Sequence, residues 1–170
     1  MSKSVCIYHS IDLDGQMSAA IVKHWWLENS TKGAVTGGIF NETDILVDII
    51  KEDSIVFIGY NYGQPISYLS KYDKVIMCDI SFKDKNNTAQ PMIELYEEFK
   101  ILGKEIHYID HHISAFNDIK LVSENGDIPF LGLQDIHYSA CELTWKYFFP
   151  GEDMPEIVRL LGRYDCFGHK

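Results

Sequence analysis

Short apolar runs alternate with longer amphipathic segments along most of the 170-residue chain. The short runs are typical of buried strands, whereas segments with apolar residues at every third or fourth position predict helices. The predicted strands span residues 5–9, 34–40, 54–60, 74–80 and 105–110. The predicted helices span residues 16–28, 43–50, 66–72, 89–102, 139–149 and 154–163.

This alternation of strands and helices predicts a protein of the α/β class. We expect a three-layer Rossmann-like domain, with a mainly parallel sheet of about five strands and helices on both faces. The sequence shows no long linker, internal repeat or low-complexity tract, so residues 1–170 are expected to form a single domain. In open sheets of this kind, ligands bind outside the carboxyl ends of the strands.

Three of the predicted strands end in acidic or imidazole side chains. Carboxylates gathered there without partners would repel one another and lose hydration. A pair of divalent cations would resolve this, as in two-metal sites that hydrolyse phosphoesters with cations about 4 Å apart. Mixed Asp and His ligands without thiolate suit Mn²⁺, with Mg²⁺, Co²⁺ or Zn²⁺ as alternatives. The candidate residues are His9, Asp12, Asp14, Asp79, Asp110, His111 and His112.

Each of these residues also has a purely structural interpretation. Asp14 precedes a predicted helix and could be its N-cap, while Asp12 and Asp79 could lie in turns. His9 alone could be a hydrogen-bonded histidine at the end of a strand. A His-His pair directly after Asp110 is harder to explain in this way. Because all of these residues are expected at one edge of the sheet, we favour the metal site.

The charge of the chain limits the classes of partner. Asp and Glu number 25 and Lys and Arg 15, which gives a formal net charge of −10. This excludes a broad electrostatic grip on long duplex nucleic acid, which normally requires a basic surface. A small anionic substrate remains compatible, because bound cations reverse the local sign of the charge.

Hydrophobicity and cysteine spacing bear on the compartment. No apolar segment approaches the roughly 18 residues of a membrane span, and the N-terminal apolar run is too short for a signal peptide. The four cysteines, at positions 6, 78, 141 and 166, form no CxxC pair. We therefore expect a cytoplasmic protein with reduced thiols, no membrane partner and no structural zinc site built on thiolates.

Four segments resemble the motifs of the DHH phosphoesterase superfamily, in order and separation. They are HSIDLDGQMSA (9–19), CDISF (78–82), YIDHHIS (108–114) and GRYDCF (162–167). The segment at 139–150 also resembles the helix between the third and fourth motifs of nuclease-like members. The superfamily includes single-strand exonucleases, oligoribonucleases, cyclic-dinucleotide phosphodiesterases and family II inorganic pyrophosphatases. The resemblance covers essentially the whole chain and is closest to the oligoribonuclease and exonuclease branch.

The resemblance implies particular roles for the candidate residues and adds Asp165. Asp110 would orient and polarise an adjacent histidine, and His112 would contact the scissile phosphate or assist the leaving group. A water between the cations would be the nucleophile. The implied metal ligands are His9 and Asp12 for the first cation, Asp14, His111 and Asp165 for the second, and Asp79 as a bridge between both.

The resemblance also implies a function. Typical members continue into a second domain with a glycine-rich, histidine-containing substrate motif, whereas this sequence ends five residues after Asp165. We expect a catalytic domain without that C-terminal substrate-binding domain, acting as a manganese-dependent phosphodiesterase on short oligonucleotides or dinucleotides. The alternatives are a pyrophosphatase or polyphosphatase and a non-catalytic nucleotide-binding module. The sequence leaves the natural substrate and the oligomeric state open.

Overall fold

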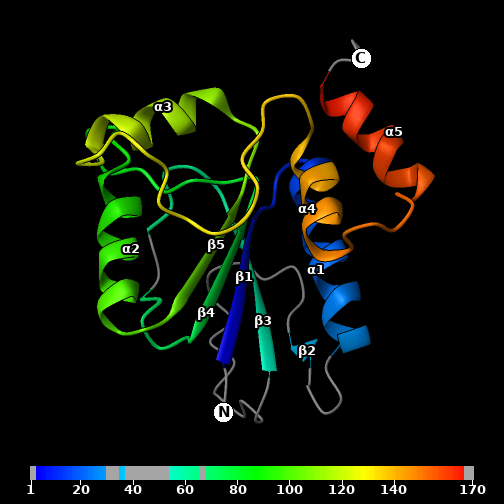
Figure 1. Ribbon diagram of the computed structural model, residues 1–170, viewed down its shortest axis with the longest axis horizontal. Coiled ribbons are helices and arrows are strands. Elements are labelled where there is room, and N and C mark those ends of the chain that lie inside the picture. Colours follow the sequence, from blue (N-terminus) through cyan, green and yellow to red (C-terminus); the bar gives the residue numbers. More distant parts are fainter. Residues whose placement is uncertain (1–2, 30–34, 37–53, 66–67, 167–170) are drawn as a thin grey trace.

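The carboxyl ends of the strands meet at one edge of a single parallel sheet. In the computed structural model, which describes residues 3–29, 35–36, 54–65 and 68–166, the strand order is β2-β3-β1-β4-β5 (Figure 1). All four strand pairings are parallel. The strands are β1 (Lys3–His9), β2 (Val35–Thr36), β3 (Ser54–Tyr60), β4 (Lys74–Cys78) and β5 (Glu105–Ile109).

The predicted α/β class and the parallel sheet are confirmed. The expectation of about five strands is met only in part, because among the described residues four strands have five to seven residues and β2 has two. The helices are α1 (Leu13–Asn29), α2 (Gln90–Ile101), α3 (Ile113–Val122), α4 (Ala140–Phe148) and α5 (Glu156–Asp165).

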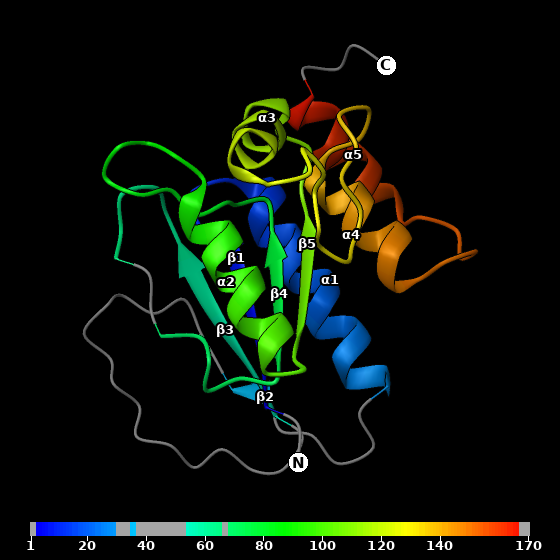
Figure 2. The ribbon, with the colours of Figure 1, turned by 60° about the vertical axis from the view of Figure 1, so that its left-hand side comes forward.

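Alternate side chains of the strands enter two separate hydrophobic clusters. Val5 and Met77 belong to a cluster that includes residues of α2 and α3. Cys6 and Ile76, the sequence neighbours of Val5 and Met77, belong to a second cluster with residues of α1 and α4. Figures 1 and 2 show these two pairs of helices on opposite sides of the strands. Burial on both sides explains why the strands read as continuous apolar runs in the sequence.

Three sequence predictions about local structure need correction. Residues 68–72 of the predicted helix 66–72 form a turn, in which the Tyr72 N–H donates to the Leu69 carbonyl at 2.9 Å. The apolar spacing of Leu69 and Tyr72 places both side chains in the core without a helix. Helix α3 has no counterpart among the predicted helices, and β4 ends two residues earlier than expected, at Cys78.

Two further predictions lie wholly or partly outside the described residues. Of the predicted strand 34–40, residues 35–36 are described and form β2. The predicted helix 43–50 lies outside the described ranges. None of the helices within those ranges combines the length and the hydrophobicity that a bilayer crossing requires.

Candidate metal centre

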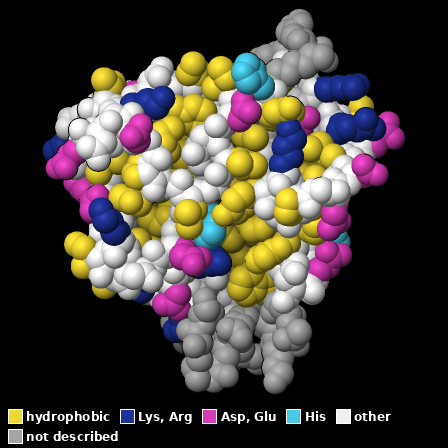
Figure 3. All heavy atoms as spheres, viewed as in Figure 1, with side chains coloured by type: hydrophobic (Ala, Val, Ile, Leu, Met, Phe, Trp, Pro, Cys, Tyr) yellow, Lys and Arg dark blue, Asp and Glu magenta, His cyan; other side chains and the backbone are white. Residues whose placement is uncertain are grey.

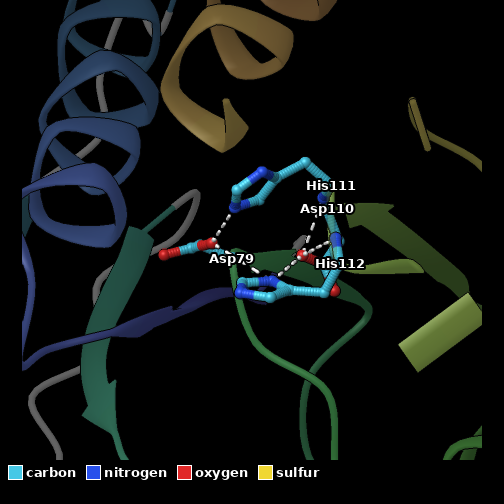
Figure 4. A group of neighbouring side chains, drawn as sticks. All are labelled: Asp79, Asp110, His111 and His112. Carbon is cyan, nitrogen blue, oxygen red and sulfur yellow. Dashed lines mark hydrogen bonds and ion pairs between the residues drawn. The ribbon is translucent and has the colours of Figure 1, made fainter. Parts of the chain in front are cut away.

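The side chain of Asp79 lies at the middle of the candidate site. Asp79 follows β4 and adopts a left-handed backbone conformation with φ of 62°, which ends the strand. Its N–H still donates to the Ile109 carbonyl at 2.9 Å, so the residue stays tied to β5. Such a conformation costs on the order of 1 kcal/mol for a residue other than glycine and is found at functional sites. Figure 4 shows the carboxylate of Asp79 pointing toward His111 and His112.

The first set of side chains, which we call the His9 group, consists of His9, Asp12 and Asp79. Nδ1 of His9, at the end of β1, lies 2.5 Å from Oδ2 of Asp12 and 3.6 Å from Oδ2 of Asp79. The Gly15 N–H donates to Oδ1 of Asp12 at 2.9 Å and fixes the other carboxylate oxygen. A Cβ at Gly15 would lie 2.1 Å from the carbonyl oxygen of His9, so this turn requires glycine.

The second set, which we call the His111 group, consists of His111, Asp14, Asp79 and Asp165. Nε2 of His111 lies 3.4 Å from Oδ1 of Asp79, 3.4 Å from Oδ2 of Asp165 and 3.7 Å from Oδ2 of Asp14. Two ligand atoms that share one cation, each about 2.1 Å from it, lie about 3 to 4 Å apart. The distances from Nε2 of His111 to each of the three carboxylates fall in this range, so His111 could share a cation with any one of them.

Asp14 also joins two distant parts of the chain. It is 2% exposed, and its two oxygens accept hydrogen bonds from the N–H groups of Ala140 at 2.7 Å and Cys141 at 2.8 Å. These are the first two residues of α4, whose N-terminus carries partial positive charge. Asp14 lies within α1, so the sequence-based alternative of an N-cap for that helix is wrong. The carboxylate instead caps α4 while one oxygen faces His111.

Asp110 is fully buried and holds the neighbouring histidine. Its Oδ1 accepts hydrogen bonds from the backbone N–H of His111 at 2.8 Å and contacts Nδ1 of His112 at 2.8 Å. Its Oδ2 accepts a hydrogen bond from the Tyr108 hydroxyl. Asp79, Asp110, His111 and His112 together form one set of neighbouring donors that could hold a metal (Figure 4). Because both oxygens of Asp110 already have donors, we regard it as a positioning residue.

The charges of the site shift the protonation of its histidines. The carboxylates of Asp12 and Asp79 raise the pKa of His9 to about 10. Burial alone would lower the pKa of His111, but Asp79, Asp14 and Asp165 outweigh it and raise the value to about 9. Asp110 likewise raises the pKa of His112. Without cations, protonated His9 and His111 therefore offset part of the carboxylate charge at neutral pH.

The pKa values of the carboxylates in the site shift in different directions. Burial, and then the charge of Asp79, raise the pKa of Asp14 to about 6. Burial also raises the pKa of Asp165. Asp12 is subject to the same effect of burial, but His9 and the Gly15 N–H overcome it and lower its pKa. The His111 group therefore holds negative charge at a cost that a bound cation would remove.

Unpaired polar atoms support a cation at this edge of the sheet. Nδ1 of His9, Oδ1 of Asp79 and Oδ2 of Asp165 are buried and lack hydrogen-bond partners. Nδ1 of His9 instead makes ionic contacts with Asp12 and Asp79. Buried polar atoms normally find a partner, and each of these three atoms can bind a metal ion. The donor set therefore fits divalent cations.

The structure brings together all the residues that the sequence singled out, and it adds one. The side chains of His111, Asp165 and Cys166 offer ligand atoms that all lie within 4.8 Å of one another. Cys166 had been read only as a reduced thiol, because it belongs to no CxxC pair. The only feature of the sequence that could have indicated Cys166 as a candidate ligand is its position directly after Asp165.

Comparison with known proteins bears on the fold alone. No family model matches the chain, and no curated protein matches it. Among solved structures, the chain is similar to an uncharacterized protein from Helicobacter pylori G27, with a TM-score of 0.52 and 16% sequence identity. The match covers 99% of this chain and 45% of that protein, so the chain spans just under half of its length.

Proposed function

We propose that the protein is a metal-dependent phosphoesterase of the DHH superfamily, a phosphodiesterase that hydrolyses short oligonucleotides or dinucleotides. The observation that carries the proposal is the position of Asp79, whose buried carboxylate faces His9 through one oxygen and His111 through the other. A carboxylate that offers one oxygen to each side can bridge two cations. The three-layer Rossmann-like form and a single catalytic domain over residues 1–170 belong to the same proposal.

The ligands divide between two cations. The His9 group would hold the first cation and the His111 group the second, with Asp79 common to both. Nitrogen and oxygen donors suit Mn²⁺, with Mg²⁺, Co²⁺ or Zn²⁺ as alternatives. When bound, the cations would activate water and stabilise negative charge on the phosphoryl oxygens.

His112 would transfer a proton to the leaving group. Its Nδ1 is engaged by Asp110, which leaves Nε2 to meet a substrate. The side chain is 39% exposed, far more than that of Asp79, so a substrate can reach it. Asp110 raises the pKa of His112, which favours the protonated imidazole that would donate to the oxygen leaving phosphorus.

The surface charge favours a short anionic substrate. Figure 3 shows Lys and Arg side chains over α5, the helix that ends at Asp165, and scattered elsewhere on that face. Arg159 and Arg163 of α5 are both exposed. A few basic groups beside the metal centre can bind the phosphates of a dinucleotide, whereas a long duplex needs an extended basic surface.

Hydrolysis of a short oligonucleotide at saturating Mn²⁺ tests the proposal. We expect Mn²⁺-dependent release of nucleoside monophosphate, and a loss on the order of a hundredfold or more in the Asp79→Asn variant. Asp153→Asn makes the same chemical change at an exposed position and should keep the activity. Full activity of Asp79→Asn, with both variants folded, would remove the proposal.

The two alternatives from the sequence predict other products. A pyrophosphatase or polyphosphatase would release inorganic phosphate from pyrophosphate and leave the dinucleotide intact. A non-catalytic module would bind nucleotide at saturating Mn²⁺ without turnover. Measuring phosphate, nucleoside monophosphate and bound nucleotide on one preparation separates the three functions.

A further inference from the structure

The thiol of Cys166 lies beside the His111 group. Its sulfur, a nitrogen of His111 and an oxygen of Asp165 all lie within 4.8 Å of one another. Cys166 is the C-cap of α5, and its N–H donates to the Gly162 carbonyl at 3.0 Å. The helix end therefore fixes the backbone from which the thiol projects, directly after the proposed ligand Asp165.

A second observation indicates that this place binds a ligand. Asp79 is 1% exposed, and its buried Oδ1 lacks a hydrogen-bond partner while lying 3.4 Å from Nε2 of His111. Oδ2 of Asp165 is also buried without a hydrogen-bond partner, and it lies 3.4 Å from the same nitrogen. Two unpaired carboxylate oxygens thus flank Nε2 of His111, and the thiol of Cys166 lies within 4.8 Å of ligand atoms of His111 and Asp165.

We propose that Cys166 is a thiolate ligand of the cation held by His111 and Asp165, and that this position consequently prefers a thiophilic cation such as Zn²⁺ over Mg²⁺. The inference deepens the proposed function, because it rests on the same metal centre. As the cation binds, the S–H bond of Cys166 breaks, the sulfur–metal bond forms, and the proton leaves to solvent.

The preference follows from the chemistry of the donors. Thiolate is a soft ligand that selects Zn²⁺ among the common divalent cations, while carboxylate favours Mg²⁺ and Mn²⁺. The His9 group offers only nitrogen and oxygen donors. The two cation positions are therefore chemically unequal, and the protein should bind one thiophilic cation and one harder cation.

The donor distances fit this assignment after a small movement. Zinc lies about 2.3 Å from sulfur and about 2.0 to 2.2 Å from nitrogen or oxygen, so in its tetrahedral sites two ligand atoms are about 3.3 to 3.7 Å apart. The atoms in question lie within 4.8 Å. Because Cys166 is half-buried at a helix end, a shift of about 1 Å or less can bring its sulfur into place.

Cobalt added to the purified, reduced protein provides the test. A cobalt–thiolate bond gives a sulfur-to-metal charge-transfer band in the near ultraviolet, whereas nitrogen and oxygen ligands give only weak visible bands. We expect the charge-transfer band in the wild-type protein and in Cys6→Ala, whose thiol is buried in β1. Cys166→Ser should lose this band while keeping the visible bands. Its Zn²⁺ affinity should fall at least about tenfold, and its Mg²⁺ affinity should change much less.

The possible results separate this inference from the proposed function. Visible cobalt bands that depend on Asp79 but come without a charge-transfer band would overturn the role of Cys166 and leave the metal centre intact. A charge-transfer band that persists in Cys166→Ser would also overturn it. Failure to bind cobalt, zinc or manganese at all would overturn both proposals.

Discussion

The charge of His9 should make the stability of the metal-free protein fall at alkaline pH. The carboxylates of Asp12 and Asp79 raise its pKa to about 10 in the folded chain, against the ordinary value of 6.5. A histidine with a raised pKa contributes stability that is fully present below about pH 6.5 and is lost as the pH rises through about 10. The lowered pKa of Asp12 reflects the same ion pair and adds no separate contribution.

These pKa values set the size of the effect. Linkage gives a contribution from His9 of about 4 kcal/mol at pH 7 and less than about 1 kcal/mol at pH 10. Asp12, the partner with the largest effect on His9, is 39% exposed, so solvent screens part of the interaction and the linkage value is an upper limit. His111, whose pKa is raised to about 9, acts in the same direction. The folded state should therefore lose about 3 kcal/mol or more between these pH values.

Urea denaturation in the presence of a chelator measures this loss. The wild-type protein should be compared with His9→Gln across pH 6.5 to 10, because the difference between them removes the titration of Lys and Tyr. We expect the difference in unfolding free energy to shrink from about 4 kcal/mol at pH 7 to under about 1 kcal/mol at pH 10. His24→Gln is the control, because His24 is exposed and forms an ion pair with the equally exposed Glu28 one turn along α1.

A constant difference between wild type and His9→Gln would refute the reasoning. So would a His24→Gln curve that matches that of His9→Gln. Either result would mean that Asp12 and Asp79 do not hold a protonated His9 in the absence of metal.

Three further predictions concern the cations, the first turn and the helix beside the centre. Because His9 and His111 must lose their protons to bind metal, Mn²⁺ affinity measured by calorimetry should rise by at least about tenfold per pH unit from pH 6 to 8. A Mn²⁺ affinity that does not change over this pH range would contradict this prediction. Gly15→Ala should lower the free energy of unfolding in urea by about 2 kcal/mol or more and weaken Mn²⁺ binding, because the added Cβ would lie 2.1 Å from the His9 carbonyl oxygen. An unfolding free energy equal to that of the wild type would show that the turn adapts. Ser139→Ala should cost about 1 kcal/mol in thermal unfolding by removing the capping box of α4, with Mn²⁺ affinity nearly unchanged, and an unaltered melting temperature would contradict the role of the cap.

The meeting of the candidate ligands could be predicted because it depends on topology alone. Parallel strands bring their carboxyl ends to one edge, so His9, Asp79 and His111 had to lie near one another once the α/β class was recognised. The resemblance to the DHH motifs added Asp165, which the pattern of the sequence places only near the end of a helix.

Other features depend on packing between distant segments. Asp14 accepts hydrogen bonds from the backbone N–H groups of Ala140 and Cys141, which lie 126 and 127 positions further along the chain. No local sequence pattern marks this pairing. Cys166 reaches His111 only because α5 packs beside α1 and α4. The helix α3 gave little sequence signal because His112 provides no side-chain cap and Ser123, rather than glycine, follows its end.

Anomalous scattering from a manganese-soaked crystal tests the central claim most directly, because it locates cations without reference to activity. We predict two peaks about 4 Å apart on either side of the Asp79 carboxylate, one among the His9 group and one among the His111 group. A single peak away from Asp79, or no peak at saturating Mn²⁺, would contradict the two-cation centre.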